Sequence, residues 1–125
     1  EIIAQIESWI PSVGDDFEVS DKNVINDESG ILYYYVLYTG NNSNYISFEA
    51  EYQQNADPYS LFEKDNSNVE RVVIRDVFIY FYENLSISVA TWYVNDIEFS
   101  VMTDLDVNEL EKIFEESFGG TYNEN

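Results

Sequence analysis

The apolar residues near the amino terminus recur every three or four positions, which is typical of an amphipathic helix. They are Ile2, Ile6, Trp9 and Val13. The spacing predicts a short helix over residues 2–10, which Pro11 ends because the residue before a proline avoids the α region. A short strand is expected at residues 17–19. The polar residues 20–30 have the composition of a loop.

From residue 31 the hydrophobic period changes to two, which is typical of β-strands. The runs 31–38 and 45–52 are separated by turn-forming residues and predict a hairpin. Further alternating runs cover residues 69–74, 77–82, 85–93 and 97–101. Short turns separate these runs, so the stretch 69–103 is predicted to form a meander of antiparallel strands.

The last element has clear boundary residues. Asp106 stands where an N-cap acceptor belongs, and Glu109 follows three residues later, as in a capping box. The apolar positions then fall on one helical face. They are Val107, Leu110, Ile113, Phe114 and Phe118. Gly119 and Gly120 end the helix.

This order of elements predicts an α+β fold. We expect a single mainly antiparallel sheet of about six to seven strands, in meander order. The N-terminal and C-terminal helices are expected to pack on one face of that sheet. No linker divides the sequence, so residues 1–125 are predicted to form a single α+β domain. Residues 53–68 are irregular, and a one-turn helix over residues 59–62 is compatible with them.

Composition excludes several classes of function. Five Lys and Arg against 25 Asp and Glu give 5 − 25 = −20, and there is no His or Cys. A thiol nucleophile, a Ser-His-Asp triad, a structural zinc site and a His-ligated haem are therefore ruled out. A basic face for binding nucleic acid is not expected either. No apolar run reaches the ~18 residues of a membrane span, so we expect no direct membrane insertion of this fragment.

Paired carboxylates are the remaining candidates for catalysis. An acid/base pair of the glycosidase type needs two carboxyl groups roughly 5–10 Å apart in a cleft. Glu49 with Glu51, and Asp96 with Glu98, are close in sequence. Both pairs occupy positions expected to face outward from a strand or a turn. We therefore expect no enzymatic activity and no cofactor.

Two acidic segments carry oxygen donors of the type that calcium prefers. One covers residues 21–28, and the other contains Asp57, Asp65 and Asn66. Neither has the ligand spacing of an EF-hand. Solvated acidic loops are the expected structure, and no metal site is predicted.

Tyrosine is abundant, with 11 residues in the chain. Aromatic side chains stabilise sheets as cross-strand pairs, and they also form platforms for protein, peptide or glycan partners. If both helices cover one sheet face, the aromatic residues of the other face must be covered by a loop or used for binding. The candidate partner surface is Tyr80, Tyr82, Trp92 and Tyr93.

The second half of the chain has a recognisable series of elements. It consists of the strands 72–82, 88–93 and 97–101, followed by residues 105–117. The series resembles a bacterial domain of unknown function. That domain lies at the extracytoplasmic C-terminal end of membrane-anchored proteins of Gram-positive bacteria, some of them anti-sigma-factor-like. Asp76 replaces a glycine of that pattern, and Phe99 replaces a tyrosine. The resemblance covers about half the chain and implies an α+β domain without known enzymatic activity or site residues.

Two functions remain open. The favoured function is that of a noncatalytic binding or sensing module of a larger bacterial envelope protein. The module is expected to be extracytoplasmic, and its parent protein to be secreted or membrane-anchored. This function predicts an exposed apolar patch on one sheet face. The alternative is a small acidic inhibitor or DNA mimic acting on a basic protein, which predicts a continuous ridge of carboxylates.

Overall fold

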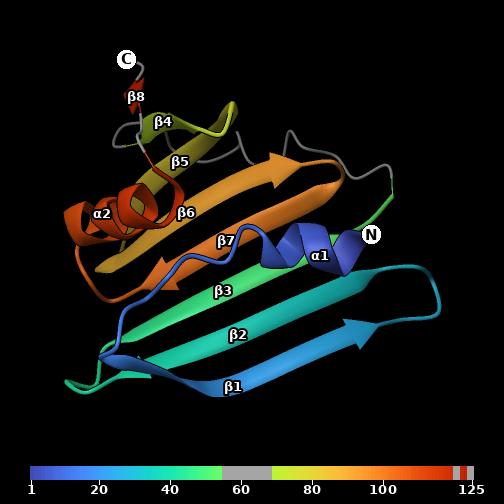
Figure 1. The fold of residues 1–125 in the computed structure, drawn as a ribbon, viewed down its shortest axis with the longest axis horizontal. Helices are drawn as coiled ribbons and strands as arrows, with labels where there is room; N and C mark the ends of the chain where they lie inside the picture. Colours follow the sequence, from blue (N-terminus) through green and yellow to red (C-terminus); the bar gives the residue numbers. More distant parts are fainter. Residues whose placement is uncertain (55–68, 120–121, 124–125) are drawn as a thin grey trace.

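The computed structural model describes residues 1–54, 69–119 and 122–123, and in these the chain forms one open antiparallel sheet with two helices (Figure 1). The helices are α1 (Ile2–Glu7) and α2 (Val107–Phe118). The strands are β1 (Phe17–Asn26), β2 (Leu32–Gly40), β3 (Tyr45–Tyr52), β4 (Glu70–Ile74), β5 (Val77–Asn84), β6 (Ile87–Val94), β7 (Ile97–Thr103) and β8 (Tyr122–Asn123). Their order across the sheet is β1-β2-β3-β7-β6-β5-β4-β8. The expected α+β class is confirmed.

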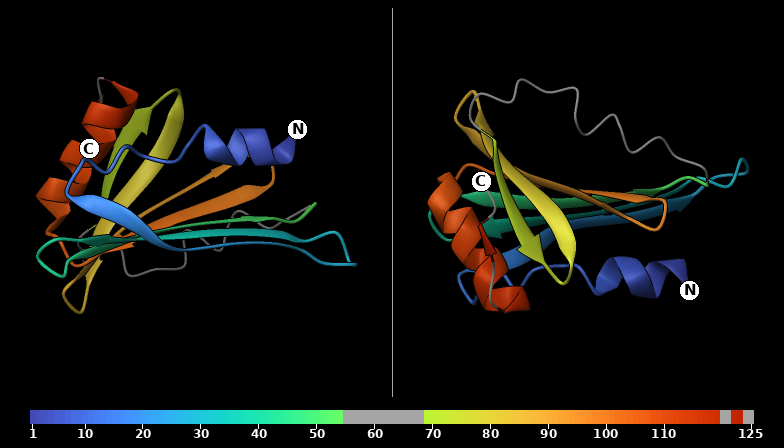
Figure 2. Two further views of the ribbon diagram at one scale, coloured as in Figure 1. Left: turned by 60° about the horizontal axis from the view of Figure 1, so that its bottom comes forward. Right: turned by 90° about the horizontal axis from the view of Figure 1, so that it is seen from above.

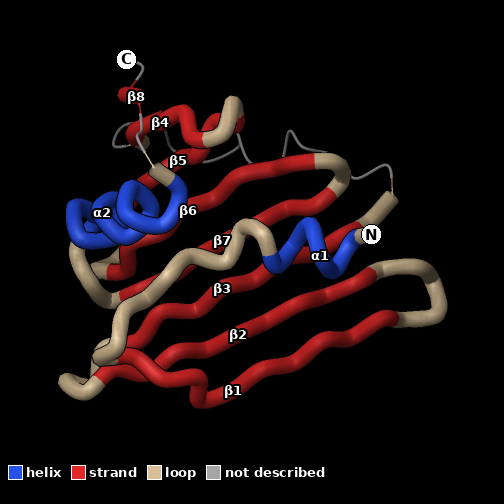
Figure 3. The backbone as a smooth tube through the Cα atoms, viewed as in Figure 1, coloured by secondary structure: helices blue, strands red, loops and turns tan. Residues whose placement is uncertain are grey.

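The predicted meander is confirmed over β4, β5, β6 and β7, whose strands follow one another through two-residue turns (Figure 3). The turn residues are Arg75-Asp76, Leu85-Ser86 and Asn95-Asp96. All six have positive φ, between 50° and 70°. This conformation matches the right-handed twist of the flanking strands, and the turns adopt it without glycine.

The two halves of the sheet meet at β3 and β7. These strands pair from Ile46 opposite Thr103 to Tyr52 opposite Ile97, although about fifty residues separate them in sequence. The pairing joins the β1-β2-β3 meander to the β7-β6-β5-β4 meander. Hydrophobic alternation predicts each meander but contains no information on which strands pair between them.

Strand β1 is much longer than expected. It extends over ten residues to Asn26, where residues 20–30 were predicted to form a loop. Nine of the ten residues are exposed, so no buried face produces an alternating pattern. The backbone hydrogen-bonding ladder to β2 stabilises this strand, with an irregularity between Val19 and Asp21. Helix α1 is shorter than the predicted 2–10, because Ser8 already acts as its C-cap.

Both helices lie on the same face of the sheet, as predicted, and the sheet curls so that β4 and β5 rise beside α2 (Figure 2). The core between helices and sheet combines aliphatic side chains with a cluster of aromatic ones. Its largest fully buried side chains include Trp92, Tyr34, Phe48, Phe81, Phe99 and Phe114. The predicted N-cap of α2 is confirmed, since the Asp106 carboxylate accepts a hydrogen bond of 2.8 Å from the Glu109 amide. Helix α2 therefore begins where the sequence indicated.

Arg75 connects three elements on the helix-covered face. Its guanidinium carbon lies 4.9 Å from the ring centroid of Trp9 and 4.6 Å from that of Phe118. Its Nη1 atom also donates a hydrogen bond of 2.8 Å to the Ser8 carbonyl, just after α1. The β4–β5 turn, the end of α1 and the end of α2 are thus held together by one cation stacked on two aromatic rings.

Candidate functional site

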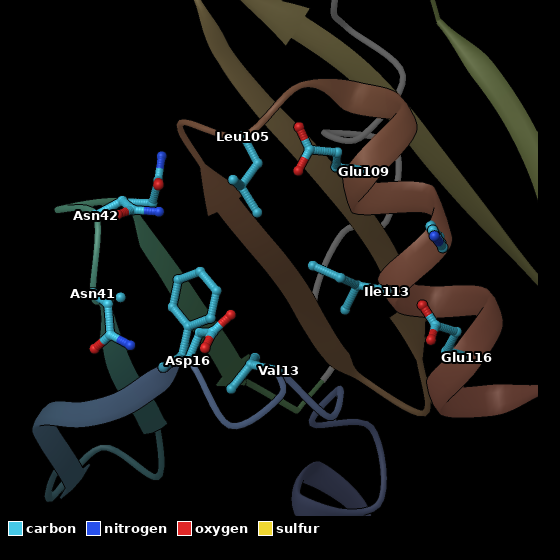
Figure 4. A pocket seen from close by; sticks show the side chains of 12 residues that line it. Val13, Asp16, Asn41, Asn42, Leu105, Glu109, Ile113 and Glu116 are labelled. Carbon is cyan, nitrogen blue, oxygen red and sulfur yellow. The ribbon is translucent and has the colours of Figure 1, made fainter.

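A groove opens between α2, the segment 13–17 and the β2–β3 turn, with a volume of about 390 Å³. This volume lies in the range of small-ligand sites. In Figure 4, Glu109, Ile113 and Glu116 project from α2, and Asp16, Asn41 and Asn42 lie across the groove from them. The groove is on the helix-covered side of the molecule, at the end of β2 and β7.

The segment 12–17 forms one wall and is fixed at both ends. At one end, the Ser12 amide donates a hydrogen bond of 2.8 Å to Ser117 Oγ of α2. At the other, the Asn41 amide donates one of 3.1 Å to the Asp16 carbonyl. The neighbouring Phe17 ring packs so closely on Gly40 that a Cβ atom there would lie 2.8 Å from Phe17 Cε1. These contacts therefore fix the position of this wall in the protein without a ligand.

The β2–β3 turn is anchored by residues at the end of β7. The Asp104 carboxylate accepts hydrogen bonds from the Tyr45 amide at 3.1 Å and from Asn44 Nδ2 at 3.3 Å. Thr103 Oγ1 donates to the Tyr45 carbonyl at 2.7 Å and accepts from the Leu105 amide at 3.1 Å. These bonds fix the asparagine-rich turn relative to the start of α2.

The lining of the groove combines an apolar floor with a charged rim. The apolar residues are Val13, Phe17, Leu105 and Ile113. The rim carries three carboxylates and one ammonium group, from Asp16, Glu109, Glu116 and Lys112. The asparagines of the turn add amide donors and acceptors. A ligand with an apolar part and positive charges matches this arrangement.

The structure separates the four residues of the predicted partner surface. Trp92 is fully buried, stacked on Phe99 with ring centroids 5.0 Å apart, so its assignment to a surface is wrong. Adjacent residues of a strand point to opposite faces, and Trp92 and Tyr93 are adjacent. Tyr80, Tyr82 and Tyr93 lie half-buried on the opposite face from the helices. Each of these three already has an interaction partner.

A second group of tyrosines lies on the same helix-free face, over β2. Tyr33 and Tyr35 have parallel rings, with centroids 6.4 Å apart and planes inclined by 8°. Glu51 and Glu49 of β3 are their cross-strand partners. In the sequence, these two glutamates stand out only as a candidate pair of catalytic carboxylates. The signal that unites the four residues is the strand register, which the hydrophobic pattern alone does not give.

The candidate metal segment 21–28 does not form a loop, because most of it belongs to β1. Asp27 binds its own turn instead, accepting hydrogen bonds from the Ser29 amide at 2.9 Å and the Ile31 amide at 3.1 Å. The Ser29 hydroxyl also donates a hydrogen bond of 2.7 Å to this carboxylate, and this bond, followed by the one from the Ile31 amide, lowers the pKa of Asp27. Among the described residues, no three His, Cys, Asp or Glu gather as a metal site would require. The segment with Asp57, Asp65 and Asn66, and the expected turn of helix at 59–62, lie outside the described residues.

One carboxyl group stands apart from the other acidic residues. Burial, a hydrogen bond to Glu70 of β4 and the charges of Glu70 and Glu115 raise the pKa of Glu111 to about 7. Glu111 lies on α2, and nothing places it in the groove lining. Its raised pKa therefore results from the packing of α2 beside β4.

The fold and the groove define an α+β protein with one antiparallel sheet, two helices on one face and a groove lined mainly by acidic and apolar residues. The chain belongs to the family described as Domain of unknown function (DUF4367), whose model matches residues 7–116. Searches of curated proteins and of solved structures found no match. The match confirms the expected resemblance to a domain of unknown function and extends it over most of the chain. No helix in the described part of the chain is long and apolar enough to cross a membrane.

Proposed function

We propose that this chain is a noncatalytic, extracytoplasmic binding or sensing module of a larger bacterial envelope protein, and that its groove receives a basic segment of a protein partner. The observation that carries the proposal is the groove, whose apolar floor is bordered by Asp16, Glu109 and Glu116. Its walls are held by hydrogen bonds from Ser12 and Asn41, so little ordering cost accompanies binding.

The charge of the whole chain supports a basic partner. A net charge of −20 attracts cationic segments over a distance and accelerates their association. The groove then provides what net charge cannot, namely an apolar contact surface beside the carboxylates. The extracytoplasmic location and the membrane-anchored, anti-sigma-factor-like context are supported by the resemblance of the strand series 72–82, 88–93 and 97–101.

The test uses a capped heptapeptide of alternating lysine and leucine as the probe, titrated by calorimetry. The groove variant combines Asp16→Asn, Glu109→Gln and Glu116→Gln. The control variant combines Glu18→Gln, Glu28→Gln and Glu83→Gln, three exposed positions outside the groove lining, and removes the same charge. We expect the groove variant to bind at least about fivefold more weakly and the control to change by less than about twofold.

An equal loss in both variants would mean that binding follows net charge alone. That result would contradict the groove and support the alternative, a small acidic inhibitor or DNA mimic that acts on a basic protein. The absence of binding by the unchanged protein at low salt would contradict both. Raising the ionic strength separates the two hypotheses further, because salt screens the interactions between charges but not the apolar contacts of the groove.

A further inference from the structure

The helix-free face of β2 carries two tyrosine rings that stand side by side along the strand. Tyr33 and Tyr35 are two positions apart, so their side chains leave the same face. Their ring planes differ by only 8° and their centroids lie 6.4 Å apart. A planar group in contact with both rings needs a spacing of ~7 Å, two carbon contact distances. The space between the two rings, the tyrosine slot, is narrower than this, because near-parallel planes lie no farther apart than their centroids. A flat group therefore enters between the rings only when one side chain rotates.

Two carboxylates border this slot from the neighbouring strand. Glu51 lies opposite Tyr33 and Glu49 opposite Tyr35 in the β2–β3 register, on the same face as the rings. Burial of the phenol, together with the negative charge of the neighbouring Glu49, raises the pKa of Tyr33 to about 12. The phenol therefore stays protonated at physiological pH. The β2–β3 register places the Glu49 carboxylate beside the rings.

The slot is accessible from solvent. Tyr33, Tyr35 and Glu49 are half-buried, and Glu51 is exposed. On the other side of the rings lies edge strand β1, where Ile25, the cross-strand partner of Tyr33, is 47% exposed. The helices cover the opposite face, so they do not limit access to these rings.

We propose that Tyr33, Tyr35, Glu49 and Glu51 recognise one arginine side chain of a protein partner. A guanidinium is planar and cationic, so it stacks on tyrosine faces while its N–H groups reach a carboxylate in a fork. A lysine ammonium provides the charge without the flat surface. The acidic character of the chain favours such a partner, and the site lies on the opposite face from the groove proposed above.

The test uses three capped tripeptides, Gly-Arg-Gly, Gly-Lys-Gly and Gly-citrulline-Gly, titrated against the whole chain while the ring signals of Tyr33 and Tyr35 are followed by NMR. We expect saturable shifts with the arginine peptide and binding at least about fivefold weaker with the lysine peptide. The citrulline peptide, flat but neutral, should bind at least about tenfold more weakly. Equal binding of arginine and lysine peptides would overturn the proposal, as would the absence of saturable shifts at about 50 mM.

Variants locate the site independently. Glu49→Gln with Glu51→Gln should weaken arginine binding at least about threefold. The matched control, Glu28→Gln with Glu83→Gln, removes the same charge elsewhere and should leave it unchanged. Tyr33→Leu with Tyr35→Leu should abolish the preference for arginine over lysine. If that variant fails to fold, the glutamine pair still decides, and an equal loss in its control contradicts the site.

The same titration distinguishes this site from the groove. The groove variant, with Asp16→Asn, Glu109→Gln and Glu116→Gln, should bind the arginine tripeptide like the unchanged protein. A loss of tripeptide binding in that variant would move the arginine site to the groove and refute the slot. Failure of the groove proposal with the lysine-leucine probe would leave the tripeptide result unaffected.

Discussion

The raised pKa of Glu111 predicts that one substitution on α2 changes how stability depends on pH. In the folded chain this carboxyl titrates at about 7, against 4.5 for an ordinary glutamate. Between these values the folded state binds more protons than the unfolded state, so the free energy of unfolding falls as pH rises. Replacement by glutamine removes the titrating group and should remove this part of the pH dependence.

The magnitude follows from the size of the shift. The difference between 4.5 and about 7 corresponds to an upper limit of ~3.4 kcal/mol. Glu111 is only partly buried, so solvent screens its interaction with Glu70 and Glu115. We therefore expect about 1 kcal/mol. Glu111→Gln should match the unchanged protein near pH 5 and exceed its stability by this amount at pH 8.

The measurement is urea denaturation at half-unit steps between pH 5 and pH 8. Glu116→Gln is the matched control, because it removes the same charge from an exposed position on the same helix. The difference between the stability–pH curves of the two variants no longer contains the contribution of the general repulsion among the acidic residues. Curves of equal slope for the two variants would refute the assignment of this pH dependence to Glu111.

Three further substitutions test the packing, each by urea denaturation at constant pH. Arg75→Gln removes a hydrogen bond and the stacking on two aromatic rings, and should lower the free energy of unfolding by about 1–2 kcal/mol. An unchanged urea midpoint would contradict a stabilising role of these Arg75 contacts. Gly40→Ala places a Cβ 2.8 Å from the Phe17 ring and should cost about 1–2 kcal/mol, whereas a neutral effect would show that the ring moves aside. Leu85→Asn should raise stability by about 1 kcal/mol, since Leu85 has a φ of +51° and is 92% exposed; a loss would mean that the leucine has a contact role.

The candidate sites were harder to predict than the fold, for a physical reason. The groove is lined by residues from the segment 13–17, the β2–β3 turn and α2, which are far apart in sequence. No motif joins them, because hydrogen bonds such as that from Ser12 to Ser117 create the proximity. The predicted partner surface failed at Trp92 for a simpler reason. Adjacent residues of a strand point to opposite faces, so Trp92 and Tyr93 cannot belong to one surface. Grouping these residues by their aromatic character overlooked this constraint.

Local patterns were sufficient for most of the secondary structure. The period of two over residues 45–52 and 77–82, and the capped amphipathic segment after Asp106, depend on interactions between residues close in sequence. Such interactions are visible in the order of side chains. In β3 the alternation also indicated which side would be buried, since Ile46, Phe48 and Ala50 alternate with polar residues.

Tertiary structure decided the remaining features. Strand β1 exists because β2 offers an unpaired backbone edge, and its own side chains are almost all exposed. The pairing of β3 with β7 depends on backbone hydrogen bonds, which are alike for every residue type and leave no trace in composition. The register of the β2–β3 hairpin places Glu49 and Glu51 beside the two tyrosines of the slot. The groove forms only when the segment 13–17 and α2 are brought to the β2–β3 turn, so it depends on contacts between residues far apart in sequence.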